Sequence, residues 1–485
     1  MYDLKDTASC SSEPPLLRAR CLIQVYRTRL VFLWNRGRVL TLGIFCKPRP
    51  THVPLSPEEV RSHILLLREK RVVYLDSAAT SLNPEPVVQA MLEYLLELSA
   101  NVERGAYRLA SEAEERWDLA RAYAAKLLLN CEPYEFVFAR NTTEALCAIA
   151  YGLEHPLLDR FGDGFREAEP LIRWKRGDSI VVSSLEHHSN LLPWMRLARH
   201  VGAELRVIDF DTRSGVIPPE NLEKAVDDRT QVVALQHCSN VTGVIHPVEE
   251  FVRIAKEANP DCIVVIDGSQ GPGHMPVDVR QIGCDAYAFS GHKGPMGPQG
   301  SGGAFVRAEL LERMDPIEIG GGTIADVTVR DYKLRDDVLS KRWEAGTPSI
   351  ACLIGLGRAA QYVAEDIGLQ RIEQHERKLV EQLIEGLREI PNVEIYGETE
   401  DLRIKAGVVS FNIRGMHSRD AALALDSMFQ PPICVRGGHH CAIPAMRRLG
   451  VWETYGGTVR ASLHYYNTEE DIEHFLKAIR HLAQL

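Results

Sequence analysis

The sequence predicts an α/β protein with a large domain built on a mostly parallel sheet, followed by a smaller C-terminal α+β domain. From residue 72 onward, short unbroken apolar runs rich in β-branched residues alternate with segments long enough for crossover helices. At 485 residues, the chain exceeds what one compact core holds. We expect an extension over 1–55, a large domain over 56–348 and a smaller domain over 349–485.

Six apolar runs are the expected strands of the large domain. They cover residues 72–75, 135–138, 179–182, 204–208, 231–235 and 262–266. Unbroken runs of this kind suit strands that are buried on both faces of a sheet. Open α/β sheets bind ligands at the carboxyl ends of their strands, so polar residues just after these runs are the candidate site residues.

A different pattern begins after residue 348. Two amphipathic helices are expected over 350–367 and 369–390, strands over 393–395 and 408–411, and a last helix over 469–483. Helices and strands in this order are typical of an α+β unit.

The composition excludes several classes of protein. It is 45% hydrophobic and 25% charged, typical of a soluble globular chain rather than a disordered or fibrous one. A net charge of -10 argues against general affinity for nucleic acid or an anionic membrane. The 11 cysteines lack disulfide-scaffold spacing and any Cys-x-x-Cys pair, which favours a reducing, cytoplasmic location.

The first 55 residues differ from the rest. No acidic residue occurs between Glu13 and Glu58, whereas Arg and Lys recur throughout this stretch. An Arg-rich, acid-poor leader can direct a protein to an organelle, but we favour a disordered extension. The apolar runs are shorter than the ~20 residues that a membrane span needs.

Lys293 and Asp267 are the most informative residues for chemistry. Lys293 follows the apolar run 286–289 in a glycine-rich loop without P-loop spacing. A desolvated amine there can form a Schiff base, whereas an ordinary surface-loop lysine is the alternative when Lys293 is taken alone. Asp267 directly follows the run 262–266, where a buried carboxylate needs a cation. The protonated ring nitrogen of pyridoxal 5'-phosphate (PLP) is such a cation.

Two further segments follow expected strands. Thr142 and Thr143 open a helix after the run 135–138, as a phosphate site or only as a helix cap. His187 and His188 are adjacent, so they face different ways and do not form the i, i+4 pair of a helical zinc site. A flat imidazole stacked on a cofactor ring and a capped loop histidine remain open alternatives.

From residue 72 to the end, the chain resembles the class V aminotransferase family of fold-type I PLP enzymes, and most closely the Suf-type (group II) cysteine desulfurases. The segments that carry the resemblance are 74–80, 140–145, 186–190, 239–240, 267–270, 290–293, 342–348, 435–442 and 460–462.

The resemblance implies a set of functional residues. The catalytic residues would be Lys293, Cys441 and His187, with Lys293 forming the Schiff base and moving protons and His187 stacking on the ring. The residues that hold PLP would be Thr142, Thr143, Asp267, Gln270, Ser290, His292, Lys293 and Thr347. Thr347 would reach the phosphate of a neighbouring subunit, which implies a homodimer. Asn240, Arg436 and Arg460 would bind the substrate.

Cys441 has three possible roles. A zinc site with Cys434, His439 and His440 is disfavoured, because the spacing fits no zinc finger, and we expect no metal. An inert buried thiol is the second possibility. A nucleophile is favoured, since Arg436 and the two histidines can stabilise a thiolate.

The expected reaction converts L-cysteine to L-alanine and leaves a persulfide on Cys441. The resemblance implies that an acceptor of the SufE or SufU kind then takes this sulfur for iron–sulfur cluster assembly, because the loop of Cys441 is short. Rival interpretations are a selenocysteine lyase, another class V carbon–sulfur lyase, and a catalytically silent assembly scaffold. The chain departs from the family at Glu103, usually His, at 294–296 after the lysine, and at Gly437, usually Thr or Ser.

Overall fold

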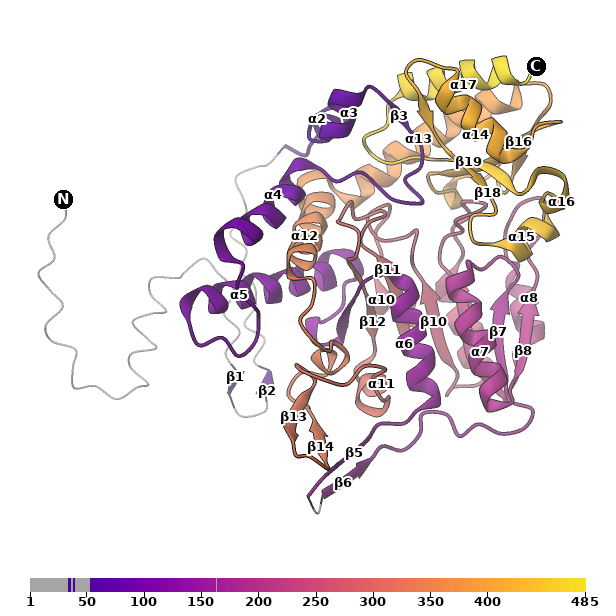
Figure 1. The fold of residues 1–485 in the computed structure, drawn as a ribbon. Helices are drawn as coiled ribbons and strands as arrows, with labels where there is room; N and C mark the ends of the chain where they lie inside the picture. The colour runs from indigo at the N-terminus through magenta and orange to yellow at the C-terminus, as the bar shows by residue number, and fades with distance from the viewer. Residues whose placement is uncertain (1–33, 36–37, 40–52, 163) are drawn as a thin grey trace, which may run out of the picture. The chain divides into compact units, whose positions relative to one another are not determined.

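A computed structural model describes residues 34–35, 38–39, 53–162 and 164–485 (Figure 1). Residues 54–485 form one compact unit. The expected extension over 1–55 lies almost entirely outside the described residues. Within it, β1 (Trp34–Asn35) pairs with β2 (Arg38–Val39) in antiparallel fashion.

The core of the compact unit is a sheet of seven strands in the order β4-β12-β11-β10-β9-β7-β8. The strands are β4 (Phe136–Ala139), β7 (Ser179–Ser183), β8 (Glu204–Ile208), β9 (Thr230–Gln236), β10 (Ile263–Asp267), β11 (Ala286–Ser290) and β12 (Gly302–Val306). Strands β8, β7, β9, β10 and β11 pair in parallel, and β12 is antiparallel to both of its neighbours. The predicted α/β fold class is confirmed.

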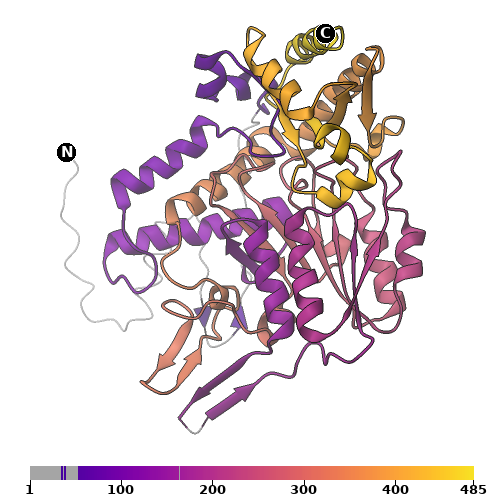
Figure 2. The same ribbon diagram turned by 45° about the vertical axis from the view of Figure 1, so that its right-hand side comes forward.

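Helices cover both faces of this sheet. Alternate residues of a strand point to opposite faces, so Val265 packs with α6 (Thr142–Glu154) and α7 (Leu192–Val201), and Val264 packs on the other face. That second face carries α5 (Arg108–Tyr123), α9 (Val248–Ala258) and α12 (Ile350–Gln361). Figure 2 shows α6 and α7 side by side in front of the strands. Burial on both faces explains why the strands read as unbroken apolar runs.

A second sheet has four antiparallel strands in the order β15-β16-β19-β18. They are β15 (Val393–Tyr396), β16 (Val408–Ile413), β18 (Arg436–Gly438) and β19 (Thr458–Ser462). Helices α13 (Leu369–Arg388), α14 (Ser418–Ser427) and α17 (Glu469–Leu482) pack against it. The helix expected over 350–367 is α12 followed by a π-helical turn over 362–367, and α12 belongs to the core of the central sheet. The boundary at residue 348 stays a prediction.

Two parts of the strand pattern differ from expectation. The run 72–75 forms β3 (Val73–Tyr74), which pairs in parallel with β17 (Ile433–Cys434) instead of joining the central sheet. Val73 and Leu75 are buried in the core of the second sheet, which accounts for this pairing. Four further strands, β5 (Leu158–Phe161), β6 (Gly164–Glu167), β13 (Ile324–Val327) and β14 (Tyr332–Leu334), form an unpredicted antiparallel sheet.

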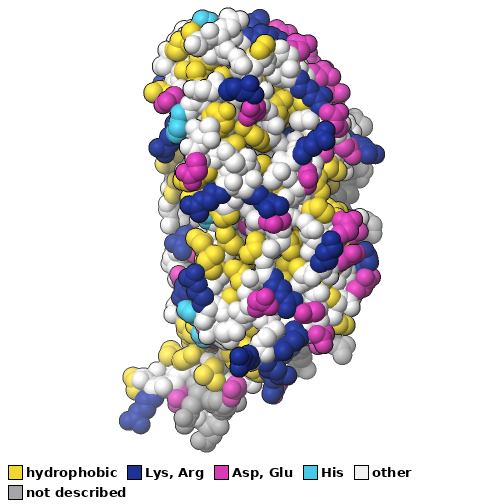
Figure 3. Space-filling model, turned by 90° about the vertical axis from the view of Figure 1, so that its right-hand side faces the viewer, with side chains coloured by type: hydrophobic (Ala, Val, Ile, Leu, Met, Phe, Trp, Pro, Cys, Tyr) yellow, Lys and Arg dark blue, Asp and Glu magenta, His cyan; other side chains and the backbone are white. Residues whose placement is uncertain are grey.

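Shorter helices complete the unit. They are α2 (Pro57–Ser62), α3 (Leu65–Lys70), α4 (Glu85–Glu93), α8 (Pro219–Ala225), α10 (Val279–Ile282), α11 (Ala308–Arg313), α15 (Ile443–Arg448) and α16 (Trp452–Tyr455). On the face drawn in Figure 3, basic and acidic side chains are interspersed with apolar ones. Within the described part of the chain, no helix has both the length and the apolar character that crossing a bilayer requires.

One buried ion pair fixes the segment that leads into α12. The carboxylate of Glu344 accepts two hydrogen bonds from Arg121, at 2.7 and 2.6 Å, and a third from the N–H of Phe138 at 2.8 Å. The side chains of Arg121 and Glu344 are only 4% and 7% exposed. Removing one partner therefore leaves a buried, uncompensated charge.

We predict that Glu344→Ala lowers the free energy of unfolding by ~3–5 kcal/mol, because the Arg121 guanidinium stays buried without its carboxylate. Urea unfolding followed by circular dichroism measures the loss. Glu400→Ala is the matched control: it breaks the exposed pair with Arg388, and we expect a cost of about 1 kcal/mol or less. Equal losses in the two variants would contradict the assignment.

Candidate active site

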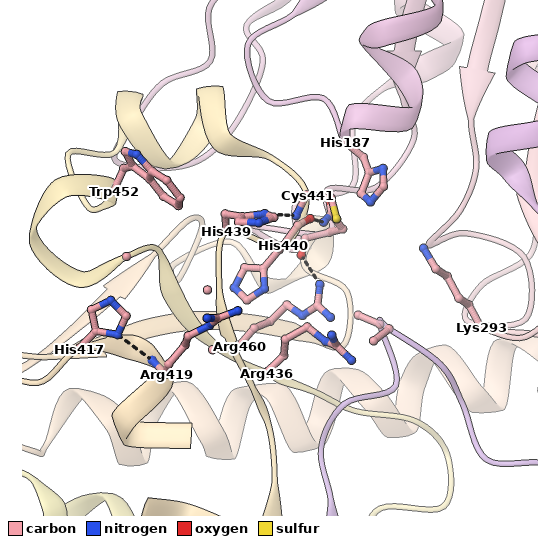
Figure 4. A pocket seen from close by; sticks show the side chains of 16 residues that line it. His187, Lys293, His417, Arg419, Arg436, His439, His440, Cys441, Trp452 and Arg460 are labelled. Carbon is pink, nitrogen blue, oxygen red and sulfur yellow. Dashed lines mark hydrogen bonds between the residues drawn. The ribbon is translucent and has the colours of Figure 1, made fainter. Parts of the chain in front are cut away.

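The carboxyl ends of the central strands bring the candidate residues to one edge of the sheet. Asp267 ends β10 and Ser290 ends β11, while His187 follows β7. A cavity of about 580 Å³ opens at this edge, and Figure 4 shows its side chains. Its walls are formed by Ala78, Ala79, His187, Asn240, Lys293, His417, Arg419, Arg436, Gly437, Gly438, His439, His440, Cys441, Trp452, Gly456 and Arg460.

The amine of Lys293 points into this cavity, towards the side on which His187 lies (Figure 4). Burial lowers the pKa of Lys293 to about 8, and the carboxylate of Asp267 opposes this shift. Burial, with a smaller effect of the Lys293 charge, lowers the pKa of His187 to about 3. His187 Nδ1 accepts the N–H of Ser189 at 3.1 Å, so its proton is on Nε2. The site thus presents a neutral imidazole and a readily deprotonated amine.

Asp267 is 3% exposed and is the hub of a hydroxyl network. Its Oδ1 accepts the N–H of Ser269 at 2.9 Å and the Ser269 hydroxyl at 2.6 Å. Ser269 Oγ lies 2.9 Å from Thr142 Oγ1, which lies 2.8 Å from Ser290 Oγ. The carboxylate and the first turn of α6 are therefore held in one arrangement.

The other expected cofactor residues surround this network. Thr143 Oγ1 lies 2.7 Å from Ser189 Oγ, and His292 Nδ1 lies 3.2 Å from Thr80 Oγ1. Gln270 is 2% exposed and donates to the carbonyl of Ala78 at 2.9 Å. Among the described residues, its Oε1 is buried without a hydrogen-bond partner. These groups fit PLP. The Lys293 amine can form an imine with its aldehyde, the buried carboxylate can pair with its ring nitrogen, and the hydroxyls and the unpartnered amide oxygen offer further polar contacts.

Cys441 is exposed and lies on a tightly fixed loop after β18. Both His440 and Cys441 have positive φ, 49° and 55°. The N–H of Cys441 donates to His439 Nδ1 at 2.9 Å, and its carbonyl accepts the N–H of His188 at 2.7 Å. Asn240 donates to the carbonyl of His440 at 2.8 Å. These bonds on both sides of the thiol hold the loop against the large domain.

Cys434, the other thiol of the zinc alternative, is in β17 and does not line the cavity. The only cluster of three potential metal ligands among the described residues is elsewhere, at His274, Glu376 and His464. The geometry therefore favours the other interpretations of Cys441.

Asp76 holds both arginines that the resemblance assigns to the substrate. Arg436 donates to its two oxygens at 3.1 and 2.7 Å, and Arg460 lies 3.4 Å from Oδ1. Arg460 also donates to the carbonyl of Asn240 at 3.0 Å, and its buried Nε has no partner among the described residues. Burial lowers the pKa of Arg460 to about 10. A buried guanidinium with a free donor suits a ligand carboxylate.

Thr347 lies outside this cavity, where its hydroxyl accepts a 3.4 Å hydrogen bond from Asn101. Its expected contact with the phosphate of a neighbouring subunit stays a prediction. Glu103, one of the departures from the family, pairs with Arg335 at 3.0 Å.

Sequence reasoning missed the role of Asp76 and a buried cluster behind the Lys293 loop. In this cluster, His274 Nδ1 is 2.9 Å from Glu376 Oε1, and His464 Nε2 is 2.9 Å from the carbonyl of Gly294. Burial raises the pKa of Glu376 to about 8 and lowers that of His274 to about 4, so it favours their uncharged forms. A Cβ at Gly294 would lie 2.7 Å from His274 Cδ2. The glycine directly after Lys293 was the signal for this close packing.

We predict that the amine of Lys293 in cofactor-free protein becomes reactive at lower pH than surface lysines do. With a pKa of about 8, half of it is neutral near pH 8, whereas the pKa of exposed Lys378 is raised above its usual value by Glu469. Reductive methylation at a series of pH values, read by peptide mass spectrometry, gives both midpoints. Asp267→Asn should shift the Lys293 midpoint to lower pH, because the carboxylate stabilises the ammonium. A common midpoint for both lysines would refute the burial of this amine.

Comparison with known proteins identifies the family of this chain. The family model for class-V aminotransferases matches residues 73–475. The chain is 44% identical to a probable cysteine desulfurase of Pyrococcus abyssi (strain GE5 / Orsay) over 428 residues, 88% of this chain and 98% of that protein.

Two solved structures are similar over nearly their full length. The apo structure of a cysteine desulfurase from Thermococcus onnurineus NA1 has a TM-score of 0.80 and 43% identity, covering 89% of this chain and 99% of that one. The cysteine desulfurase CsdA from Escherichia coli has a TM-score of 0.75 and 30% identity, covering 89% and 98%. The chain described here belongs to the class-V aminotransferase family.

Proposed function

We propose that this protein is a PLP-dependent cysteine desulfurase that converts L-cysteine to L-alanine and keeps the sulfur as a persulfide on Cys441. The observation that carries the proposal is that the Lys293 amine and the Cys441 thiol lie in the walls of one cavity, which Arg460 also lines (Figure 4). The similar proteins named as cysteine desulfurases support it.

Substrate binding falls to the arginines and Asn240. The α-carboxylate of cysteine would pair with Arg460, whose Nε is free, and Asp76 keeps that guanidinium in place. Asn240 is 5% exposed and has a buried Oδ1 without a partner in the described chain, which can accept a ligand N–H. Arg436 adds positive charge at the same wall.

The residues that would hold PLP are those at the strand ends. Thr142, Thr143, Ser290 and His292 would bind its phosphate, with Thr347 from a second subunit, and Asp267 and Gln270 would bind its ring. When bound, the cofactor supplies an electron sink for the bond changes at the substrate carbons. Lys293 would hold and move the proton at the α-carbon, since its pKa of about 8 leaves both charge states accessible near neutral pH. His187 would stack on the ring.

Cys441 would perform the sulfur transfer. Its thiolate attacks the substrate sulfur, an S–S bond forms as the substrate Cβ–S bond breaks, and the carbon fragment takes up a proton to become alanine. The loop around Cys441 is fixed by His439, His188 and Asn240, so the sulfur stays in the cavity wall after the reaction.

The proposal also covers the sulfur acceptor, the oligomeric state and the cellular location. A fixed loop cannot carry sulfur far, so we propose a dedicated protein acceptor of the SufE or SufU kind and a role in iron–sulfur cluster assembly. A homodimer follows if Thr347 completes the phosphate site of its neighbour. The cysteine composition supports a cytoplasmic site of action.

We predict that Cys441→Ala abolishes persulfide formation and lowers alanine production from L-cysteine at least ~100-fold, because no other thiol lines the cavity among the described residues. Alanine is measured by chromatography, and the persulfide by mass spectrometry of the alkylated peptide. Cys434→Ala is the matched control, since this half-buried thiol lies outside the cavity, and it should keep both activities. The yellow absorbance of bound PLP should persist in both variants.

The Cys441→Ala variant also distinguishes a cysteine desulfurase from a selenocysteine lyase. A selenocysteine lyase releases selenium without needing an accepting thiol, so it would survive the loss of Cys441. If Cys441→Ala turns over selenocysteine as fast as the parent, and the parent makes little alanine from cysteine, the desulfurase proposal is wrong. A colourless protein that stays inert with added PLP would remove the enzymatic interpretation altogether.

A further inference from the structure

The cavity continues past Cys441 on the side away from Lys293. Figure 4 shows Lys293 and His187 on one side of the thiol, and His417, Arg419 and Trp452 on the other. We call this second part, lined by His417, Arg419, His439, Trp452 and Gly456, the outer chamber. The cavity therefore extends beyond Cys441 on the side opposite Lys293.

The wall that carries Arg419 is held firmly in place. Ser418 is fully buried, and its hydroxyl donates to the carbonyl of Tyr455 at 2.8 Å. The N–H of Arg419 donates to His417 Nδ1 at 3.3 Å. The first of these bonds ties the start of α14 to the last residue of α16, and the second fixes the first turn of α14 itself.

Two glycines allow this wall to approach the Cys441 loop. A Cβ at Gly437 would collide with the carbonyl oxygen of Ser418, and a Cβ at Gly456 would collide with the ring of His417. The glycine at position 437 and the position of Arg419 therefore belong together. A side chain at 437 would force the start of α14 away from the cavity.

Three arginines line the cavity, and Arg419 is the one that has no carboxylate partner among the described residues. Arg436 and Arg460 share the carboxylate of Asp76, whereas Arg419 forms no ion pair with any described residue. L-Cysteine carries one carboxylate, which the proposed function gives to Arg460. A cationic wall on the far side of the thiol is thus left for a second anion.

We propose that the outer chamber binds the carboxylate of the thiol that takes sulfur from Cys441. This inference rests on the proposed function and adds the chemistry of the acceptor. The acceptor thiolate attacks the outer sulfur of the persulfide: a new S–S bond forms, the bond to Cys441 Sγ breaks, and Cys441 leaves as a thiolate, so no oxidant or reductant is needed. Arg419 brings the acceptor to this sulfur by pairing with its carboxylate.

The carboxylate can come from a free small thiol or from an acidic residue beside a cysteine in a protein. Both sources present the same pair of groups, a thiol and an anion a few bonds apart. The stem between them would lie near Trp452 and His439, whose rings are 5.8 Å apart, centroid to centroid.

The test measures sulfur release separately from sulfur uptake. PLP-loaded enzyme is charged with ³⁵S-labelled cysteine, freed of substrate by desalting, and then chased with 3-mercaptopropionate or with uncharged 2-mercaptoethanol. The measured quantity is the release rate constant with 3-mercaptopropionate divided by that with 2-mercaptoethanol. Changes that affect both thiols equally cancel in this ratio.

We expect Arg419→Gln to lower this ratio roughly three- to fivefold, the size of an exposed ion pair, and Arg419→Lys to retain most of it. High salt should lower the parent ratio towards that of Arg419→Gln. Arg447→Gln is the matched control, because Arg447 is an exposed arginine on α15 outside the cavity lining, and it should keep the ratio within twofold.

An unchanged ratio in Arg419→Gln, or an equal fall in Arg447→Gln, would overturn the proposal. Failure to charge Cys441 with label at all would instead overturn the proposed function, so the two failures are distinguishable. A peptide pair with Glu-Cys and Gln-Cys identifies the source: discrimination between them that Arg419→Gln removes assigns the carboxylate to a protein acceptor. Discrimination limited to the free thiols assigns it to a small molecule.

Discussion

The carboxylate of Asp76 is the interaction on which the substrate side of the cavity depends. It lies two residues after β3 and holds the guanidinium groups of Arg436 on β18 and Arg460 on β19. Two like charges on neighbouring strands repel each other, and a shared counter-ion is what lets both face the same space. Without it, the buried Arg460 would lose its only carboxylate partner among the described residues.

The electrostatics of the cavity follow from this arrangement. Burial lowers the pKa values of Lys293, His187 and Arg460 together, and each of these groups faces positive neighbours. The carboxylate of Asp76 offsets part of that charge at Arg460, and the carboxylate of Asp267 offsets another part at Lys293. The remaining positive field suits anionic ligands, namely an amino-acid carboxylate, a phosphate and a thiolate.

Much of this arrangement could be predicted from sequence because it is local. The strands before Asp267 and Ser290 are recognisable as apolar runs, and chemistry-bearing residues directly after such runs meet at one sheet edge. The resemblance to a known family then supplied roles for Lys293 and Cys441. The class of fold and the family could therefore be predicted from the sequence alone.

What could not be predicted depends on contacts between distant segments. Nothing in the run 72–75 indicates that it pairs with β17 rather than the central sheet, since a parallel partner leaves no local signal. Asp76 and Glu376 have ordinary sequence neighbours, and their importance comes only from partners far along the chain. Gly294 and Gly437 did stand out as departures, but the sequence does not reveal the distant segments that pack against them, which are 272–274 and 418–419.

The pairing of β3 with β17 has a consequence for how the protein is made. Asp76 and its partners Arg436 and Arg460 are separated by 360 and 384 residues. During translation, the segment that leads to Asp76 emerges early. It cannot pair with β17, and Asp76 cannot bind the two arginines, until nearly the whole polypeptide has left the ribosome. Contacts of such long range close late and slowly. The proposed substrate site is therefore among the last features to assemble on a nascent chain, and a truncated product would lack it altogether.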